Sequence, residues 1–102
     1  MNAVKVQYTV KKEYVETNKA NIQRVMADLK DINNPNLKYS AFLLDDGKSF
    51  VHFAMRFDEQ AQKTLSDLPS FQEFQRQLKE SGPEAAPKAE PLNFVGSSWD
   101  IF

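Results

Sequence analysis

An Asp46-Gly47 pair between two strand-like segments constrains the fold of this chain more than any other feature. Aromatic and aliphatic residues are frequent on both sides of the pair, in segments 37–44 and 49–57. Asp-Gly is favoured in tight turns whose twist matches that of paired strands. The sequence therefore predicts a β-hairpin with a two-residue loop, in which Leu44 faces Ser49.

Both faces of this predicted hairpin are apolar. One face carries Ser40, Phe42, Leu44, Val51, Phe53, Met55 and Phe57. The opposite face carries Leu37, Tyr39, Ala41, Leu43, Phe50, His52, Ala54 and Arg56. Since two helices on the same side cannot cover both faces of a sheet, one apolar face must stay open. We expect helices over the Phe42 and Phe53 face, and an open face around Tyr39, Leu43, Phe50 and His52.

The remaining segments complete a β-α-β-β-α-β order. Residues 4–10 alternate as a half-buried strand does, and residues 15–32 show helical spacing. Asn33-Asn34-Pro35-Asn36 ends that helix, Asp58 can cap a second one, and Pro69 begins its continuation. Residues 83–91 are expected to form an extended connection, and residues 92–95 a last strand. We therefore expect a single α+β, ferredoxin-like domain over residues 1–102, with two helices on one face of a four-stranded antiparallel sheet.

Composition narrows the classes of function. The 102 residues include 13 basic and 14 acidic ones, which gives a net charge of −1. We therefore expect neither a nucleic acid nor a membrane as a partner. The chain has no cysteine, and no segment has the apolar length or composition of a membrane span or a signal core. The cytoplasm is the expected compartment.

Three segments resemble a known superfamily: Tyr39–Phe42, Asp45–Phe53 and Leu68–Gln75. Together with Val95-Gly96-Ser97 and the aromatic tail after them, they are similar to small bacterial proteins of the dimeric α+β barrel superfamily, which includes the antibiotic-biosynthesis monooxygenase-like domains. The resemblance covers most of the chain but rests on residues that set the fold. It implies a homodimer in which two ferredoxin-like sheets pack face to face into a barrel.

The resemblance also implies activities that range from cofactor-independent oxygenation to haem degradation. His52 and Trp99 do not reproduce the asparagine, histidine and tryptophan set of the haem-degrading members, so no cofactor is expected. The partner implied for this chain is a second copy of itself. Leu43 on the open face, with Trp99, Ile101 and Phe102 in the tail, are the expected interface residues. Packing of the tail on its own chain is the equally weighted alternative.

His52 is the only histidine and the candidate general base, because an imidazole titrates near neutral pH. We expect it in a cavity between the two sheets that binds a small hydrophobic molecule. The expected ligand-binding residues are Gln7, Thr9, Tyr39, Phe50 and Arg56. His52 has no histidine or cysteine companion, so a metal site is not expected. Asn18 is expected in the first turn of its helix near solvent, rather than as a buried amide.

Two other functions compete with ligand oxidation. The first is a non-catalytic dimerisation module whose interface is filled by side chains. The second is RNA binding, because the RNA-recognition motif has the same element order and residues 46–53 match part of its third-strand pattern. In that pattern Lys48 and Phe50 would take the base-stacking positions, and the low net charge disfavours binding to phosphate.

Overall fold

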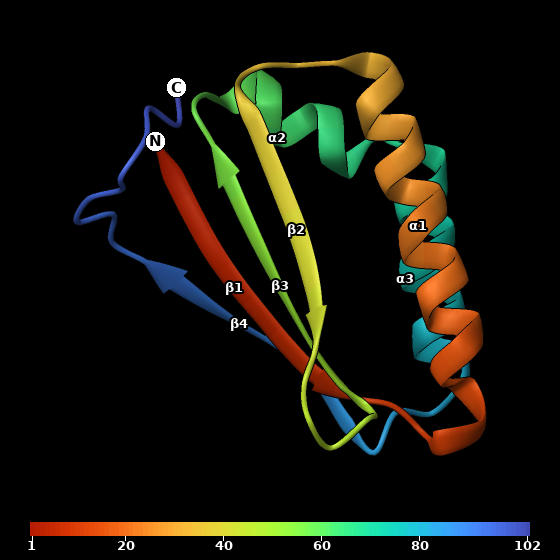
Figure 1. Ribbon diagram of the computed structural model, residues 1–102. Coiled ribbons are helices and arrows are strands. Elements are labelled where there is room, and N and C mark those ends of the chain that lie inside the picture. The colour runs from red at the N-terminus through yellow and green to blue at the C-terminus, as the bar shows by residue number, and fades with distance from the viewer.

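The computed structural model describes residues 1–102 and shows a four-stranded antiparallel sheet with all helices on one side (Figure 1). In chain order the elements are β1 (Asn2–Thr9), the 3-10 turn η1 (Lys12–Tyr14), α1 (Val15–Ile32), β2 (Leu37–Leu43), β3 (Ser49–Arg56), α2 (Glu59–Ser66), α3 (Pro69–Glu80) and β4 (Ala85–Leu92). The strand order is β2-β3-β1-β4. The ferredoxin-like arrangement expected from the sequence is confirmed.

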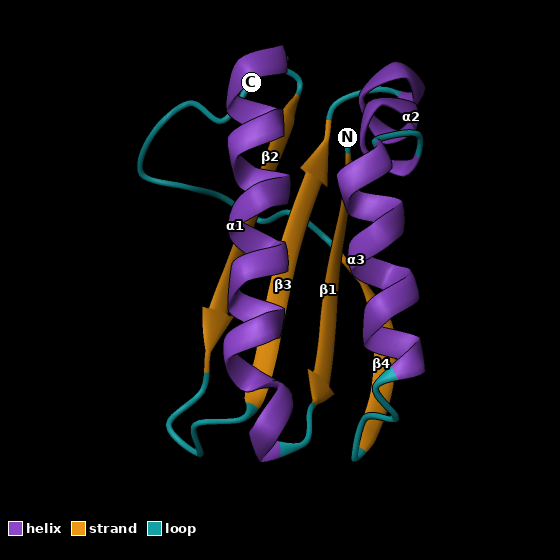
Figure 2. Ribbon diagram, turned by 90° about the vertical axis from the view of Figure 1, so that its right-hand side faces the viewer, coloured by secondary structure: helices purple, strands orange, loops and turns teal.

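The helices begin and end where the sequence predicts. Asn33 ends α1 in the left-handed conformation, with φ of 54°. Asp58 caps α2, because its carboxylate accepts a hydrogen bond from the backbone N–H of Ala61 at 2.8 Å. Pro69 occupies the first turn of α3, where its missing N–H costs no helical bond. Figure 2 shows α1 and α3 side by side in front of the sheet.

The predicted hairpin register is also confirmed. β2 and β3 pair from Leu37 opposite Arg56 to Leu43 opposite Phe50, and Leu44 donates to the carbonyl of Ser49 at 2.8 Å. Gly47 has φ of 77°, which a residue without a Cβ adopts at little cost. The turn is closed by Asp46, whose carboxylate accepts from the backbone N–H groups of Lys48 and Ser49.

The predicted assignment of helices to sheet faces is wrong. Phe50, His52 and Ala54 lie under the helices and are only 2%, 4% and 5% exposed. Phe42 is 56% exposed and lies on the opposite, open face with Phe53. The Tyr39 and His52 face is therefore part of the core between sheet and helices, and the Phe42 and Phe53 face is the one left uncovered.

The pairing of β1 with β3 is the physical reason for this reversal. Directly opposed residues of antiparallel strands share a face, and β1 places Val6 opposite His52 and Tyr8 opposite Phe50. The other face of β1 is polar, with Lys5 opposite Phe53. Because the apolar side of β1 must be buried, the side of β3 that shares its face is buried with it.

The last strand also differs from the expectation. β4 spans Ala85–Leu92 and pairs with β1 from Ala3 opposite Leu92 to Thr9 opposite Ala85. Its residues were expected to form an extended connection, because Pro87 and Pro91 interrupt them. β4 is an edge strand, and an edge strand tolerates proline because one side of it needs no N–H donor.

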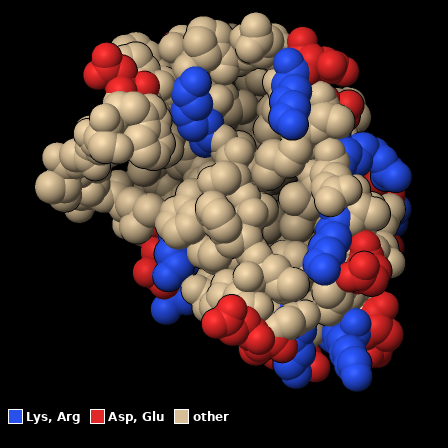
Figure 3. All heavy atoms as spheres, in the orientation of Figure 1, with Lys and Arg blue, Asp and Glu red and all other residues tan.

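After β4 the chain turns toward the open face and crosses it. Its end lies near β2, at the opposite edge of the sheet (Figures 1 and 2). The ring of Phe102 contacts that of Phe57 with centroids 5.5 Å apart. Trp99 nevertheless stays 70% exposed. In Figure 3 charged side chains gather over the helices and the hairpin end, and few lie over the tail. None of the helices has the length and apolar character that crossing a membrane requires.

Candidate functional site

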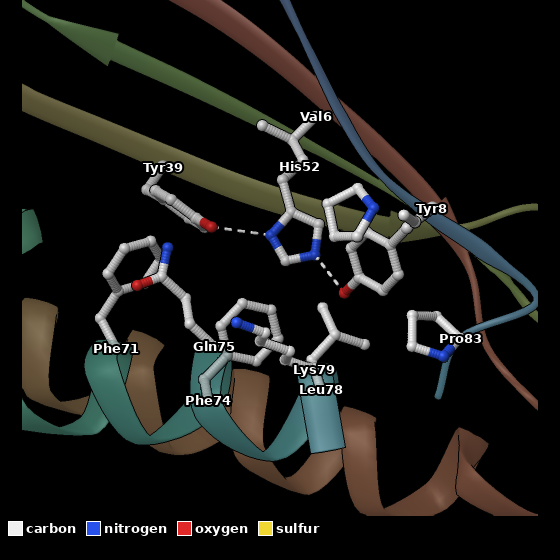
Figure 4. Close-up of a pocket in the computed structure, with 12 residues that line it drawn as sticks. Val6, Tyr8, Tyr39, His52, Phe71, Phe74, Gln75, Leu78, Lys79 and Pro83 are labelled. Atoms are coloured by element: carbon white, nitrogen blue, oxygen red, sulfur yellow. Dashed lines mark hydrogen bonds between the residues drawn. The ribbon is translucent and has the colours of Figure 1, made fainter. Parts of the chain in front are cut away.

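A cavity of about 460 Å³ opens between the helix-covered face of the sheet and α3 (Figure 4). β1, β2 and β3 supply one wall, α3 supplies the other, and the segment leading into β4 closes one end. The lining residues are Val6, Tyr8, Tyr39, His52, Phe71, Phe74, Gln75, Leu78, Lys79, Pro83, Ala86 and Pro87. This is a mainly apolar site with a few polar groups, as is typical of pockets for small molecules.

A continuous chain of hydrogen bonds crosses the inner wall of the cavity. The amide nitrogen of Asn18 donates to the hydroxyl of Tyr8 at 2.9 Å. That hydroxyl lies 2.8 Å from Nε2 of His52, and the Tyr39 hydroxyl lies 2.7 Å from Nδ1 of the same ring. Both nitrogens of the only imidazole are therefore held by tyrosine hydroxyls (Figure 4).

The direction of the chain follows from the Asn18 end. Because the Tyr8 oxygen accepts from the Asn18 amide, its own proton goes to Nε2 of His52. A neutral imidazole then carries its proton on Nδ1 and donates it to the Tyr39 oxygen. The Tyr39 proton has no acceptor in the protein. In this arrangement the chain of hydrogen bonds ends at the cavity in a free O–H donor.

Burial keeps this chain uncharged at neutral pH. Desolvation lowers the pKa of His52 to about 4, so the ring is neutral. The same cause raises the pKa values of Tyr8 and Tyr39 well above that of a free phenol. The site therefore offers neutral hydrogen-bonding groups in an apolar surrounding, where each hydrogen bond is stronger than in water.

Aromatic packing from α3 fixes the His52 ring. Phe74 stacks on it with centroids 5.5 Å apart, and Tyr39 meets it edge-on at 5.7 Å. Phe71, one turn before Phe74, contacts the Tyr39 ring at 6.1 Å. Phe74 and Leu78 face the core because they repeat at helical spacing, as the sequence predicts. Two rings on one helix thus hold the positions of both Tyr39 and His52.

Only two of the residues predicted for the site line this cavity, Tyr39 and His52. Gln7 lies on the open face, opposite Val51, and Thr9 bonds the Ser49 hydroxyl beyond the cavity. Phe50 packs in the core against Tyr8. The expected grouping of Gln7 and Thr9 with His52 is therefore wrong, since the parity of the β1–β3 register puts them on opposite faces.

Arg56 does not reach the cavity either, because it lies at the end of β3 and donates to the side chain of Asn2. The four expected interface residues also fall in different places. Leu43 is on the helix side of edge strand β2, beside α1, and not on the open face. Trp99, Ile101 and Phe102 follow the open face on their own chain.

The expectation for Asn18 is wrong, since its side chain is fully buried. It lies in the first turn of α1 as expected, but it bonds Tyr8, while its amide oxygen has no partner. Tyr8 was likewise missed as a site residue. A sequence signal for it exists, because it interrupts the alternating valines Val4, Val6 and Val10 with a residue that carries a hydroxyl.

The RNA-binding alternative depends on rings exposed on the third strand. In the matched pattern Phe50 takes a stacking position, yet it is 2% exposed beneath the helices. The third strand shows Val51, Phe53 and Met55 on its open face instead. No group of three or more His, Cys, Asp or Glu side chains is arranged to hold a metal ion.

Comparison with solved structures identifies the fold. A crystal structure of an antibiotic biosynthesis monooxygenase superimposes with a TM-score of 0.74 and 14% identity over 94% of this chain and 100% of that chain. Rv0793 from Mycobacterium tuberculosis superimposes with a TM-score of 0.78 and 13% identity over 96% of this chain and 98% of that chain. These identities show a shared fold, the ferredoxin-like fold of antibiotic biosynthesis monooxygenase-like proteins, which agrees with the resemblance seen in the sequence.

A third neighbour is a crystallised variant of SnoaB from Streptomyces nogalater, a cofactor-independent oxygenase. It superimposes with a TM-score of 0.64 and 14% identity over 97% of each chain. No protein-family model and no curated protein sequence matches this chain.

Proposed function

We propose that this chain binds a small, mainly apolar molecule in the cavity between its sheet and α3, and holds an oxygen of that molecule by the Tyr39 hydroxyl. One observation carries the proposal: a buried hydrogen-bond chain ends beside an apolar cavity at the Tyr39 hydroxyl, whose only partner in the protein is His52. The volume of about 460 Å³ lies within the range of small-molecule sites, roughly 300 to 1,000 Å³.

The proposal extends to oxygenation of the bound molecule without a cofactor, the activity named for the structural neighbour SnoaB. In such a reaction the ligand supplies the electrons. An activated ligand methylene loses two hydrogens, which leave as water with one atom of O₂, and the other atom becomes a carbonyl oxygen. A hydrogen bond from Tyr39 to the ligand oxygen would stabilise the negative charge that develops when the methylene loses its first proton.

His52 is the proposed base for that first proton, acting through Tyr39. Reversal of the chain turns the Tyr39 O–H toward His52 Nδ1. The Tyr39 oxygen can then take the ligand proton while its own proton passes to Nδ1, and the new O–H donates to the ligand oxygen. The negative charge formed on the ligand stabilises the imidazolium, which burial alone disfavours. The reversal also turns the Tyr8 O–H toward Asn18, whose buried amide oxygen lacks a partner in the present orientation. Rotation of the Asn18 amide would give that oxygen a donor, so both directions of the chain can be satisfied.

Native mass spectrometry of the gently purified protein tests the binding proposal. We expect a non-covalent adduct on the wild-type chain. Ala86→Trp should lose the adduct, because Ala86 lines the cavity from the exposed edge strand and a larger side chain there fills the space. An adduct that persists unchanged in Ala86→Trp would place the ligand elsewhere and contradict the proposal.

Oxygen uptake by the protein with the identified molecule tests the chemical step. His52→Gln should lose uptake while the molecule still binds, because the cavity keeps its shape but loses its base. Equal uptake by wild type and His52→Gln would rule out the role of His52 as base and leave the binding role of the cavity.

We further propose that a second copy of the chain covers the open face of the sheet. Phe42 is 56% exposed there, and Phe94 and Trp99 in the adjoining tail are 52% and 70% exposed. Exposed apolar side chains gathered on one face of a small domain are typical of an interface. This interface uses the Phe42 and Phe53 face, not the His52 face, so the ligand cavity lies within one chain and not between two sheets.

A further inference from the structure

The cavity has two polar side chains set apart from the hydrogen-bond chain of Tyr8, His52 and Tyr39. Gln75 and Lys79 both line it, one helical turn apart on the same side of α3. Figure 4 shows both side chains extending from α3 over the cavity. Neither side chain forms a hydrogen bond or an ion pair within the protein, and Lys79 is the only charged residue in the lining.

The acidic residues next to Lys79 along the chain do not neutralise it. Glu80 pairs with Arg76, and Glu84 pairs with Lys48 at 2.7 Å. A second ammonium group lies near the same end, because Nζ of Lys11 is 3.2 Å from the position that a Cβ on Gly82 would take. The next residue, Pro83, lines the cavity. This end of the cavity therefore attracts an anion.

The two polar ends of the cavity are separated along α3. Phe71 marks the Tyr39 end, since its ring contacts that of Tyr39. Lys79 follows eight residues later, which is roughly 12 Å along a helix. Apolar side chains, those of Phe74, Leu78 and Val6, line the space between. A ligand that reaches both polar ends must therefore be elongated and apolar in its middle.

We propose, building on the function proposed above, that the ligand is an elongated apolar molecule with a carboxylate at one end and a hydrogen-bonding oxygen at the other. Gln75 and Lys79 bind the carboxylate, and Tyr39 binds the oxygen. An amide N–H and an ammonium group together suit a carboxylate, because hydrogen bonds to a charged acceptor are the stronger ones. Lys79 thereby selects anionic over neutral ligands of the same shape.

A matched pair of probes tests this assignment: a hydroxynaphthoate with hydroxyl and carboxylate at opposite ends, and its neutral methyl ester. Isothermal titration calorimetry at low ionic strength gives the affinity of each. We expect the wild-type chain to bind the acid about three- to tenfold more tightly than the ester, as a partly solvated ion pair with a hydrogen bond provides. Added salt should weaken binding of the acid alone.

Two lysine variants separate a local contact from overall charge. Lys79→Gln should reduce affinity for the acid to that for the ester and leave the ester unchanged. Lys63→Gln makes the same change in net charge on α2, away from the cavity, and should retain the preference. Equal effects of the two variants, or no preference in wild type, would overturn the anion assignment while the cavity proposal stands.

The Ala86→Trp variant distinguishes failure of this inference from failure of the proposed function. Both probes should lose affinity when the cavity is filled. If both probes bind Ala86→Trp as they bind wild type, the cavity is not the binding site, and the proposed function and the anion assignment are both wrong. If neither probe binds the wild-type chain although the adduct of the purified protein is lost in Ala86→Trp, only the anion assignment is wrong.

Discussion

The hydroxyl of Tyr39 lies 2.7 Å from Nδ1 of His52, and it is the point where the buried hydrogen-bond chain meets the cavity. Tyr8 holds the opposite nitrogen of the ring and is itself only 2% exposed. Two chemically identical hydroxyls therefore have different surroundings. The Tyr39 hydroxyl can also bind a ligand, whereas the Tyr8 hydroxyl already has two partners within the protein, Asn18 and His52.

Removal of these hydroxyls should accordingly have different effects. Tyr8→Phe leaves both His52 Nε2 and the Asn18 amide without a buried partner, which costs about 1–3 kcal/mol for each group. Tyr39→Phe should cost less stability, because Tyr39 is only half-buried and water can reach its place. Urea denaturation measures both values. A larger loss for Tyr39→Phe would contradict the assignment of Tyr39 as the accessible end of the chain.

The stability of the fold should fall on acidification between about pH 6.5 and pH 4. The pKa of His52 is lowered from 6.5 to about 4 by burial, so the unfolded chain takes up a proton first in this range. The contribution of the neutral His52 ring to stability is fully present above pH 6.5. It is lost as the pH falls to the pKa of His52 in the folded chain, about 4. The expected loss is about 3 kcal/mol, since each pKa unit corresponds to about 1.4 kcal/mol.

Denaturation curves at several pH values measure this dependence, and His52→Phe is the control that removes the titrating group. The wild-type slope between pH 6.5 and pH 4.5 should disappear in the variant. Glu73 contributes little, because its hydrogen bond from Arg76 lowers its pKa from 4.5 to about 2, and its effect on stability is lost mainly between those two values, below this window. A variant with the wild-type slope would assign the effect to another group.

Asn18 should control the protonation of His52 through Tyr8. Asn18→Asp replaces the amide that donates to Tyr8 by a carboxylate that can only accept. Tyr8 would then turn its O–H to Asp and accept from His52 Nε2, and the nearby negative charge would favour the imidazolium. The pKa of His52, followed by NMR, should rise above that of the wild-type chain. An unchanged or lower pKa would show that Asn18 does not set the direction of the chain.

The hairpin and the element order could be predicted because they depend on local chemistry. Asp46-Gly47 fixes the turn, Asn33 and Pro69 mark helix ends, and each acts through its own backbone geometry. The identity of the buried face could not be predicted from the hairpin alone, since both of its faces are apolar. The information lay in β1, where only the side with Val6 and Tyr8 is apolar.

The cavity could not be predicted from the sequence alone. His52 and Tyr39 were recognisable as polar residues on one face, but their partners come from distant segments. Asn18 is brought to Tyr8 by packing of α1, and Gln75 and Lys79 look like ordinary exposed residues of an amphipathic helix. Sequence patterns give the face of each element, whereas a cavity depends on how far apart two packed elements stand.

Association through the open face is tested by two neighbouring residues of β2 that point to opposite sides. Phe42→Asp should dissociate the proposed dimer, because it places a charge in the exposed apolar face. Leu43→Asp places the same charge on the helix side of the same edge strand and should leave the dimer intact. Light scattering after size-exclusion chromatography gives the masses. Dissociation by Leu43→Asp alone would place the interface along the strand edge beside α1.

Trp99, the only tryptophan, reports where the tail packs. In a single chain its side chain is 70% exposed, so its fluorescence should be that of a solvated indole. If the tail docks on a partner, Trp99 emission from a concentrated sample lies at shorter wavelength than that of a solvated indole. Dilution should then shift the emission to longer wavelength, because the dimer dissociates. The spectrum of Phe42→Asp should not depend on concentration. A wild-type spectrum that stays constant while the measured mass halves would mean that Trp99 does not become buried against the partner.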